Sequence, residues 1–419
     1  FQIGEDGFVQ TLVRLCVAED AMIDAAVQGF EDAGSGNKIH VRDPEGIELR
    51  AAVILDAAGA AAWDRGVEVE SHRALFLAAE AAGFKRGLWN VEARLWSGTP
   101  MRKRFENPPP NERHRISDVV RWKLGLLPRE QPVIADAPDE PAAWKALDPR
   151  EIAKPPERGW RVAWLGHASF LLQGCGVSLL VDPVFADHCG PFPLPGLFRK
   201  VPPPCAISDL PRIDAVLLTH SHYDHLDLTT LRKLGRGTPI WIAEGHAEWL
   251  RGKGFSKVSE LAWNHGAALA PGVFLTALPA HHFTARTPWD RDLGHWCGWL
   301  IEGGGCKLWH AGDSAWFPGF AEIGGKHGPI DFGMIPIGAY QPRRVMKSVH
   351  MNPEEAVKAF QATRCRRAAG MHWGTFPLTD EPMREPVLRL EKALLEQKIT
   401  PQAFTTGGVG DVWMVEPVT

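Results

Sequence analysis

A short polar segment near the middle of the chain carries the residue types of a metal site. His220, His222, Asp224 and His225 lie within six residues of one another. Imidazole nitrogen suits zinc, iron, copper or nickel, whereas carboxylate oxygen suits harder ions. A mixed set of this kind is typical of a hydrolytic metal centre rather than of a solvated polar turn. The segment therefore predicts that a metal is bound here.

Predicted strands must hold these ligands in place. The apolar run 215–218 directly precedes the segment and predicts a buried strand. Catalytic ligands tend to follow strands, because the strand aims them and the loop leaves an open coordination position. Further candidates follow later strands in the same way: His281 or His282, Asp313, and His372. Adjacent histidines on an extended backbone point in opposite directions, so only one of the pair at 281–282 can enter the site.

Apolar periodicity predicts an α/β domain. Short apolar runs between turn residues predict strands over 161–165, 169–173, 177–181, 215–219, 240–243, 273–278, 296–301, 307–310, 332–335 and 368–371. Helical spacing predicts helices over 228–234, 247–252, 353–363 and 385–396. The third helix has Asn352 as its N-cap, and Glu355 completes a capping box. Strands with interleaved helices indicate a layered fold.

Length, charge and cysteines limit the class of protein. The chain has 419 residues and a net charge of −4, which argues against a nucleic-acid partner because such binders need a basic face. Its seven cysteines lack CxxC spacing, which fits reduced thiols in the cytoplasm. No segment approaches the roughly 20 apolar residues of a membrane span. We predict a small mixed α/β appendage of unknown role over 1–98, a proline-rich connector or strap over 99–158, and a hydrolase domain over 159–419.

Together these residues resemble the metallo-β-lactamase fold hydrolases. The shared features are the segment 220–225, His282, Asp313 and His372. One branch is more similar, because 219–227, 312–313, 335–340, 353–356 and 372–376 resemble N-acyl-phosphatidylethanolamine-hydrolysing phospholipase D. The resemblance extends from about Phe105 to the C-terminal region. It implies a four-layer αββα sandwich with two divalent metal ions, zinc by resemblance and manganese or iron as alternatives.

The resemblance also implies which residues hold which metal. One ion would be held by His220, His222 and His282, the other by Asp224, His225 and His372, with Asp313 bridging them. Two metals roughly 3.5–4 Å apart can lower the pKa of a bound water and clamp the attacking and leaving oxygens of a phosphodiester. Metal-bound water then replaces a protein nucleophile, so Asp224 and Asp313 are expected to serve catalysis as ligands.

Three residues near the predicted ligands are candidates for supporting roles. Asp182 would accept a hydrogen bond from a ligating imidazole, or cap a turn. His167 lies in a turn that resembles the family and is expected to be structural rather than ligating. His350 matches a family position near the substrate, where it would contact a phosphate or water, unless it is an ordinary loop histidine.

The two tyrosines of the chain and one arginine complete the candidates. Tyr223 lies between the predicted ligands and would face the catalytic site or pack beneath it. Tyr340 would donate to a substrate oxygen or anchor its own turn. Arg343 would attract a phosphate or lie in an exposed basic turn.

The segment 189–205 is rich in proline and apolar residues and contains Arg199 and Lys200. It is expected to be either a lid over an acyl-chain groove that touches anionic lipid, or a packed loop that proline makes rigid.

The implied activity is a phospholipase D-type hydrolysis of N-acyl-phosphatidylethanolamine-like lipids or of a small phosphodiester. Alternatives on the same metals are a lactonase, a cyclic phosphodiesterase and a sugar-phosphate lactone hydrolase. An alternative of another class is a non-catalytic metal-loaded binding protein. We expect a cytoplasmic protein, and the sequence leaves open a homo-oligomer and a peripheral contact with the inner face of a membrane.

Overall fold

The computed structural model describes residues 41–42, 48–49, 104–109, 116–128, 130–287 and 289–417. The chain divides into two compact units, Phe1–Thr99 and Pro100–Thr419. In the first unit, β1 (Val41–Arg42) and β2 (Glu48–Leu49) pair in antiparallel fashion. The rest of the appendage predicted over 1–98 lies outside the described residues. All the candidate ligands belong to the second unit.

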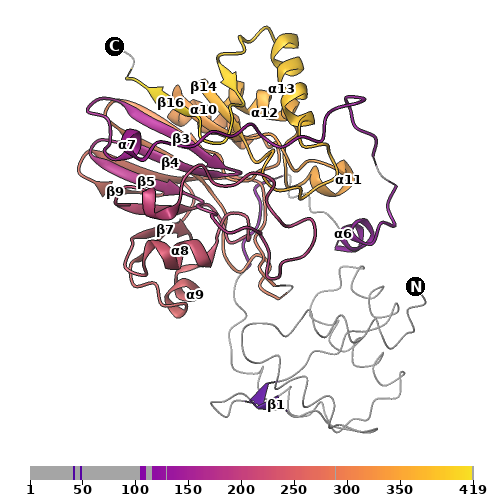
Figure 1. The fold of residues 1–419 in the computed structure, drawn as a ribbon, viewed down its shortest axis with the longest axis horizontal. Coiled ribbons are helices and arrows are strands. Elements are labelled where there is room, and N and C mark those ends of the chain that lie inside the picture. Colours follow the sequence, from indigo (N-terminus) through magenta and orange to yellow (C-terminus); the bar gives the residue numbers. More distant parts are fainter. Residues whose placement is uncertain are drawn as a thin grey trace. The chain divides into compact units, whose positions relative to one another are not determined.

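Two seven-stranded sheets form the centre of the second unit (Figure 1). The first sheet has the order β16-β3-β4-β5-β6-β7-β8. Its strands are β3 (Trp160–Gly166), β4 (Ser169–Gly174), β5 (Val177–Val181), β6 (Ala215–Leu218), β7 (Ile240–Ala243), β8 (Val258–Leu261) and β16 (Val412–Val415). The second sheet has the order β15-β14-β13-β12-β11-β10-β9. Its strands are β9 (Gly266–Ala270), β10 (Val273–Leu278), β11 (Gly298–Gly303), β12 (Cys306–His310), β13 (Ile330–Pro336), β14 (Cys365–Met371) and β15 (Phe404–Thr405).

Helices cover the outer face of each sheet (Figure 1). On the first sheet these are α8 (Leu228–Leu234) and α9 (Ala247–Gly252). On the second they are α10 (Gly319–His327), α12 (Pro353–Ala362) and α13 (Glu385–Glu396). The predicted four-layer αββα sandwich is therefore confirmed, and so is the capping box of α12.

The central strands are apolar on both faces because each sheet lies between helices and the other sheet. In β3, Val162 and Trp164 join the core that includes residues of both sheets. Ala163 and Leu165 instead join the core beneath α8 and α9. These four side chains are buried, so the strand is held from both sides and its end is fixed in space.

The ligand-bearing strands of the second sheet end at one edge of the sandwich. Strand β11 is antiparallel to both β10 and β12, and β12, β13 and β14 are parallel. The C-terminal ends of β10, β12 and β14 therefore lie on the same side. The loop after β6 meets them there, because His220 and His222 approach His282 and Asp313.

Some elements differ from the prediction. Every predicted strand is present, but β8, β9, β15 and β16 were not predicted because they are short and β8, β9 and β16 are partly exposed. Helix α10 was also missed, since its sequence GFAEIGGKH contains three glycines, which are poor helix formers. The remaining elements are short: α6 (Ile116–Lys123), α7 (Pro149–Ile152), α11 (Arg343–Met346) and a 3₁₀ turn, η2 (Ile207–Asp209).

The region expected as a connector lies against the sandwich at several points. The Ala142 amide donates to the Gly374 carbonyl (3.0 Å), and Trp144 forms an isolated β-bridge with Val409. On α6, Asp118 pairs with Arg344 (3.1 Å). All three contacts are made to the C-terminal part of the second unit, at positions 344, 374 and 409.

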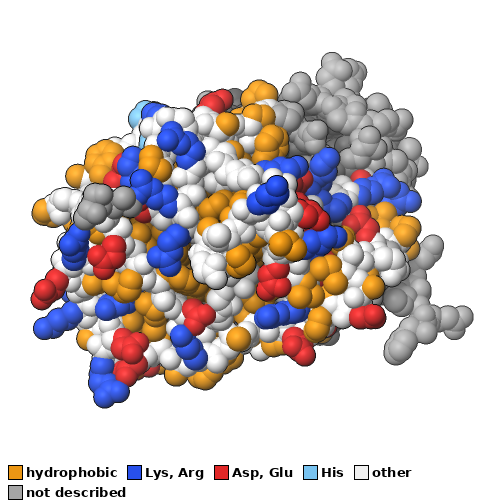
Figure 2. All heavy atoms as spheres, turned by 90° about the horizontal axis from the view of Figure 1, so that it is seen from above, with side chains coloured by type: hydrophobic (Ala, Val, Ile, Leu, Met, Phe, Trp, Pro, Cys, Tyr) orange, Lys and Arg blue, Asp and Glu red, His pale blue; other side chains and the backbone are white. Residues whose placement is uncertain are grey.

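Charged side chains of both signs are interspersed with apolar ones on the face shown in Figure 2. Within the described residues, no helix is long and apolar enough to cross a membrane. The six cysteines of this part carry free thiols, in keeping with the absence of a predicted disulfide framework.

Candidate metal centre

The loop between β6 and α8 gathers the first group of candidate ligands. The amides of His225 and Leu226 both donate to the carbonyl of His222 (3.1 and 2.8 Å), which curls the chain immediately after the strand. Asp227 then caps α8 by accepting from the Thr229 amide (2.9 Å). The curl brings the imidazoles and the Asp224 carboxylate to one side of the loop.

Left-handed backbone conformations occur at or just before two other candidate ligands, His372 and Asp313. Gly312, which precedes Asp313, has φ 63°, and a Cβ there would lie 2.5 Å from the Cys297 carbonyl oxygen. Only glycine fits this turn, and the turn directs Asp313 into the site. His372 itself has φ 65°, and its amide donates to the carbonyl of His167 (3.1 Å).

The first candidate metal group contains His220, His222, His282 and Asp313, whose ligand atoms lie within 4.8 Å of one another. His222 Nδ1 is 2.8 Å from His220 Nε2 and 3.2 Å from His282 Nε2. Asp313 Oδ2 is 3.7 Å from His282 Nε2 and 4.0 Å from His220 Nε2. These imidazole nitrogens converge on a common point, as ligands of one cation would.

The second group contains Asp224, His225 and His372, with His167 beside them. Asp224 Oδ2 lies 3.6 Å from His225 Nε2 and 3.3 Å from His372 Nε2. His167 Nε2 is 2.9 Å from the same carboxylate oxygen, so His167 orients Asp224 and lies closer to the centre than a purely structural turn residue would.

Asp313 lies between the two groups. Its Oδ2 is 3.0 Å from His225 Nε2 and 3.1 Å from His372 Nε2, in addition to its contacts with the first group. His350 approaches the same oxygen at 4.0 Å and forms a third group with Asp313 and His372. A single carboxylate is thus placed to reach both predicted metal positions.

A buried hydrogen-bond network fixes the ligand rings. Asp182 accepts from the amide and the hydroxyl of Thr219 (2.8 and 2.6 Å) and from Nδ1 of His225 (2.7 Å). Thr219 Oγ1 also lies 2.9 Å from Nδ1 of His220, and His282 Nδ1 donates to the Val349 carbonyl (2.8 Å). Each contact occupies Nδ1 and leaves Nε2 to face the centre, as in metal sites whose ligands are oriented from behind.

The electrostatics of the cluster favour cations. Burial opposes the charged form of His225, yet Asp313 and Asp224 hold its pKa well above the usual range. The same two carboxylates outweigh burial at His372 and raise its pKa to about 9. At His220, burial and the neighbouring imidazoles keep the pKa well below the usual value. The carboxylates therefore favour positive charge in the cluster, while the crowded imidazoles oppose protonation of one another. Divalent cations would supply the positive charge without protonating the imidazoles.

Buried polar atoms in the cluster test whether metals fit. Nε2 of His225, Nε2 of His372 and Oδ1 of Asp313 have no hydrogen-bond partner. A buried polar atom without a partner costs about 1–3 kcal/mol, and here such atoms concentrate among imidazoles and carboxylates. As ligands of divalent cations these atoms would gain a partner, so the residues present fit a metal centre.

The structure resolves the choice between the adjacent histidines. His282 joins the first group, whereas His281 uses its amide to donate to Ser314 Oγ (2.9 Å) and its Nδ1 to donate to the Ser348 carbonyl (3.0 Å). His281 therefore packs beside the site, in accordance with the choice of His282 that the resemblance favours.

Tyr223 packs against Arg286, which bears on the two interpretations of this residue. Its hydroxyl donates to the carbonyl of Arg286 (3.2 Å), and its ring lies under the Arg286 guanidinium at 3.8 Å. The same guanidinium donates to the carbonyls of Ser221 and Leu226 (2.8 Å each). Of the two interpretations, the packing one agrees with this geometry: Tyr223 and Arg286 brace the ligand loop from behind.

Tyr340 and Arg343 also point away from a substrate role. The buried Tyr340 hydroxyl donates to Glu385 on α13 (2.7 Å), which anchors its turn. The Arg343 guanidinium donates to Glu355 (2.8 Å) and to the carbonyl of His350 (3.0 Å). Of the two interpretations of Tyr340, the turn anchor agrees with this geometry, and Arg343 supports the backbone of His350. A contact of either side chain with a substrate oxygen stays a prediction.

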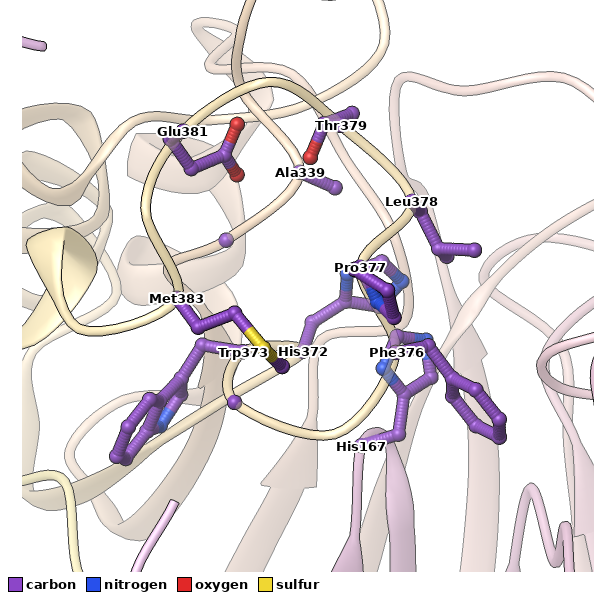
Figure 3. A pocket seen from close by; sticks show the side chains of 12 residues that line it. His167, Ala339, His372, Trp373, Phe376, Pro377, Leu378, Thr379, Glu381 and Met383 are labelled. Atoms are coloured by element: carbon purple, nitrogen blue, oxygen red, sulfur yellow. The ribbon is translucent and has the colours of Figure 1, made fainter. Parts of the chain in front are cut away.

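A pocket opens beside the second metal group (Figure 3). His167 and His372 line it together with apolar side chains of the loop that follows β14, including Phe376, Leu378 and Met383. The pocket therefore places a wall of apolar side chains, together with Thr379 and Glu381, beside the candidate centre.

The proline-rich segment 189–205 packs against this wall. Leu197 lies in a small apolar cluster with Cys189, Phe376 and Leu378. Arg199 is not free to meet lipid, because its guanidinium donates to the carbonyls of Val184 (2.8 Å) and Ala186 (3.0 Å). The packed-loop interpretation therefore describes Leu197 and Arg199. Leu194 and Phe198 remain 45% and 41% exposed, and we call these two side chains the exposed rim of the segment.

Comparison with known proteins agrees with this geometry. Residues 178–373 match the family profile described as a beta-lactamase superfamily domain. An N-acyl-phosphatidylethanolamine-hydrolyzing phospholipase D of Caenorhabditis elegans is 34% identical over 271 residues, which cover 61% of this chain and 76% of the relative. The chain belongs to the metallo-β-lactamase superfamily.

One further sequence relative and one solved structure are also similar to this chain. An uncharacterized protein of Mycobacterium tuberculosis is 33% identical over 352 residues, 78% of this chain and 93% of that protein. The crystal structure of an isothiocyanate hydrolase from Delia radicum gut bacteria superposes with a TM-score of 0.51 at 18% identity, over 62% of this chain and all of that one; this likeness shows the shared fold. The protein is a metal-dependent hydrolase of this superfamily, near the phospholipase branch.

Proposed function

We propose that this metallo-β-lactamase-fold hydrolase uses two divalent metal ions to cleave a phosphodiester, with phospholipase D-type activity on N-acyl-phosphatidylethanolamine-like lipids. The convergence of six histidine and aspartate side chains around Asp313 carries the proposal. The activity for which the C. elegans relative is named supports the substrate class. Zinc is the proposed metal, with manganese and iron as alternatives that the same ligands accept.

Each ligand group has a defined part in this proposal. One ion would be held by His220, His222 and His282, the other by Asp224, His225 and His372, with Asp313 shared. When bound, such a pair of cations supplies an activated water and stabilises charge on phosphoryl oxygens. Asp182 and the Val349 carbonyl hold Nε2 of His225 and of His282 toward the ions. His350, at the edge of the cluster, is assigned to a substrate oxygen.

Metal analysis tests this proposal directly. We expect elemental analysis of the purified chain to find two metal ions per molecule. Removing them with a chelator should lower the hydrolysis of bis-p-nitrophenyl phosphate by at least about a hundredfold, because the lost charge stabilisation is worth several kcal/mol. Adding zinc, manganese or iron back should restore turnover. One metal per chain, or unchanged activity after metal removal, would contradict the dinuclear mechanism.

A substrate panel separates the alternatives that use the same metals. Lipid vesicles, bis-p-nitrophenyl phosphate, cyclic nucleotides and lactones should be compared at equal metal content. Preferential turnover of lactones would replace the phosphodiesterase proposal with a lactonase. A metal-loaded chain that turns over none of these substrates would support a binding protein.

The exposed rim of segment 189–205 offers a test of lipid as the substrate. We expect Leu194→Ser with Phe198→Ser to lower turnover of vesicle lipid about tenfold, since two partly exposed apolar side chains would no longer leave water on binding. Hydrolysis of water-soluble diesters by the variant should stay within about twofold of that by the unaltered chain. The measurement is kcat/KM for both substrates.

A matched control pair is Leu395→Ser with Met414→Ser. These side chains are exposed apolar residues, 79% and 41%, on α13 and β16, away from the segment 189–205. They should leave both activities unchanged. Equal losses on lipid and on soluble diester in the Leu194/Phe198 variant would rule out a role of this rim in lipid binding.

A further inference from the structure

A residue far upstream of the superfamily match holds the backbone of a candidate metal ligand. The side-chain amide of Asn107 donates to the carbonyl of His282 (2.8 Å), and its Oδ1 accepts from the amide of the same residue (2.9 Å). Asn107 lies outside residues 178–373, which match the family profile. It belongs to the region that the sequence identified only as a connector.

This pair of hydrogen bonds replaces a missing strand partner. Strand β10 ends at Leu278, so the peptide groups of His282 lie beyond the ladder of the sheet. An asparagine amide presents one donor and one acceptor, as a backbone peptide does. Asn107 therefore satisfies both peptide groups of a buried residue, which would otherwise lack partners at a cost of about 1–3 kcal/mol each.

The backbone contact determines where the His282 imidazole lies. The Val349 carbonyl accepts from Nδ1 of His282 and sets the rotation of the ring. Asn107 sets the position of the main chain that carries the ring. With both constraints in place, Nε2 lies 3.2 Å from Nδ1 of His222, in the first metal group.

The neighbouring histidine shows what the contact selects. His281 has other partners: its amide donates to Ser314 Oγ and its Nδ1 donates to the Ser348 carbonyl. A shift of this segment by one residue would exchange which of the two histidines faces the cluster. The Asn107 contacts oppose such a shift, because both of them are made to the peptide groups of His282.

The segment that presents Asn107 is anchored separately. The amide of Phe105 donates to the carbonyl of Asp292 (2.8 Å), and its ring stacks on His295 with centroids 4.5 Å apart. Asn107 is therefore delivered to His282 by contacts that do not depend on the metal ligands. Asn107 is itself only partly buried, so the anchoring of its segment and its two hydrogen bonds make its amide a support for His282.

We propose that Asn107 is a positioning residue of the metal centre, which holds His282 in place as a ligand of the first ion. The inference rests on the proposed dinuclear centre and deepens it. It assigns part of the metal site to the segment before the superfamily domain. Loss of this support should weaken one of the two metal positions and leave the other nearly intact.

The test uses the full-length chain, stripped of metal and titrated with Zn²⁺ against a competing chelator. Asn107→Ala removes both contacts, and Asn107→Asp keeps the size of the side chain but cannot donate to the His282 carbonyl. Each variant should lose about tenfold or more in affinity at one site, the usual effect of removing a support behind a ligand. With Co²⁺ in place of Zn²⁺, the absorption bands of that site should change, which a general loss of stability would not produce.

Gln173→Ala is the matched control. This buried amide donates to the Ile152 carbonyl (2.8 Å) and accepts from Arg161 (2.9 Å) at the far end of β4. It should lower stability without altering either metal affinity. Asn107→Asp decides the matter if Asn107→Ala does not fold.

Metal affinity within twofold of the unaltered chain in the folded variants would overturn the assignment of Asn107. An unaltered chain that binds two metals but cleaves no phosphodiester would overturn the proposed function and leave this inference standing. An unaltered chain that binds no metal would overturn both.

Discussion

Replacing Asp313 with asparagine is expected to remove at least one metal ion per chain and to lower turnover about a thousandfold, because charge stabilisation worth several kcal/mol is lost. Asp313 Oδ2 lies 3.0 Å from His225 Nε2, 3.1 Å from His372 Nε2 and 3.7 Å from His282 Nε2. These distances place one carboxylate against ligands of both groups. Asparagine keeps the size of the side chain and removes the charge that such a bridge requires.

The charge of Asp313 also governs its neighbours before any metal binds. Burial opposes its ionisation, yet His225 and His372 hold the pKa of the carboxyl well below the usual range. A neutral amide would leave two buried imidazoles facing each other with less compensating charge. We therefore expect the metal-free variant to differ from the original chain as well, with less positive charge held in the cluster.

Metal content by elemental analysis and kcat/KM on bis-p-nitrophenyl phosphate measure this effect. Asp331→Asn provides the control, since Asp331 accepts from the Lys307 amide (2.8 Å) and pairs with Arg366 (3.3 Å) near the start of β13. That substitution removes the same charge at the opposite edge of the sheet, because Asp331 lies at the start of β13 whereas Asp313 follows the end of the parallel strand β12. Two metals per chain and turnover within tenfold in Asp313→Asn would show that the two groups do not share this carboxylate.

The placement of most candidate ligands could be predicted because it depends on local sequence. An apolar run predicts a strand, and the first polar residues after it lie at the end of that strand. His220, Asp313 and His372 are identified in this way, each from a few adjacent residues. Because parallel strands of one sheet end at the same edge, the runs before Asp313 and His372 predict neighbouring ligands without any knowledge of distance. His220 follows β6 of the other sheet, and only the packing of the two sheets brings it to the same place.

The orientation of side chains within the cluster could not be predicted locally. In the structure His282 is contacted by Asn107 and by the Val349 carbonyl, and neither position carries a recognisable motif. The same limitation explains the tyrosines. A phenol beside ligands looks catalytic in the sequence, but Tyr223 is engaged by the Arg286 carbonyl and Tyr340 by Glu385.

The second large effect is expected at Asp182, a residue that touches no predicted metal. Asp182 has no exposed surface and accepts three hydrogen bonds, from the Thr219 amide, the Thr219 hydroxyl and His225 Nδ1. In Asp182→Asn one oxygen becomes an amide group, which must face at least one of these donors. We expect the affinity for metal to fall about 10–100-fold, as is usual when the partner behind a ligating imidazole is lost.

The physical reason lies in the ring of His225. A carboxylate on Nδ1 fixes the tautomer that leaves Nε2 free for a cation and increases the basicity of that nitrogen. An amide oxygen would still accept from Nδ1 but would supply no charge, and an amide nitrogen would repel it. In either orientation Thr219, which also contacts His220, loses a partner, so both ligand groups are affected through one buried side chain.

Titration of the metal-free chain with Zn²⁺, together with the free energy of unfolding at saturating metal, distinguishes a role in ligand orientation from a role in folding alone. Asp214→Asn is the comparison, because Asp214 accepts from the Ser178 amide (2.9 Å) just before β6, whereas Asp182 follows β5 at the opposite end of the same strand pair. Asp214→Asn should change stability and leave the affinity for metal unaltered. If Asp182→Asn behaves in the same way, the carboxylate only stabilises the fold. If the affinity falls while saturating metal restores much of the stability, Asp182 acts through His225, because a ligand that binds only the folded chain stabilises it in proportion to its occupancy.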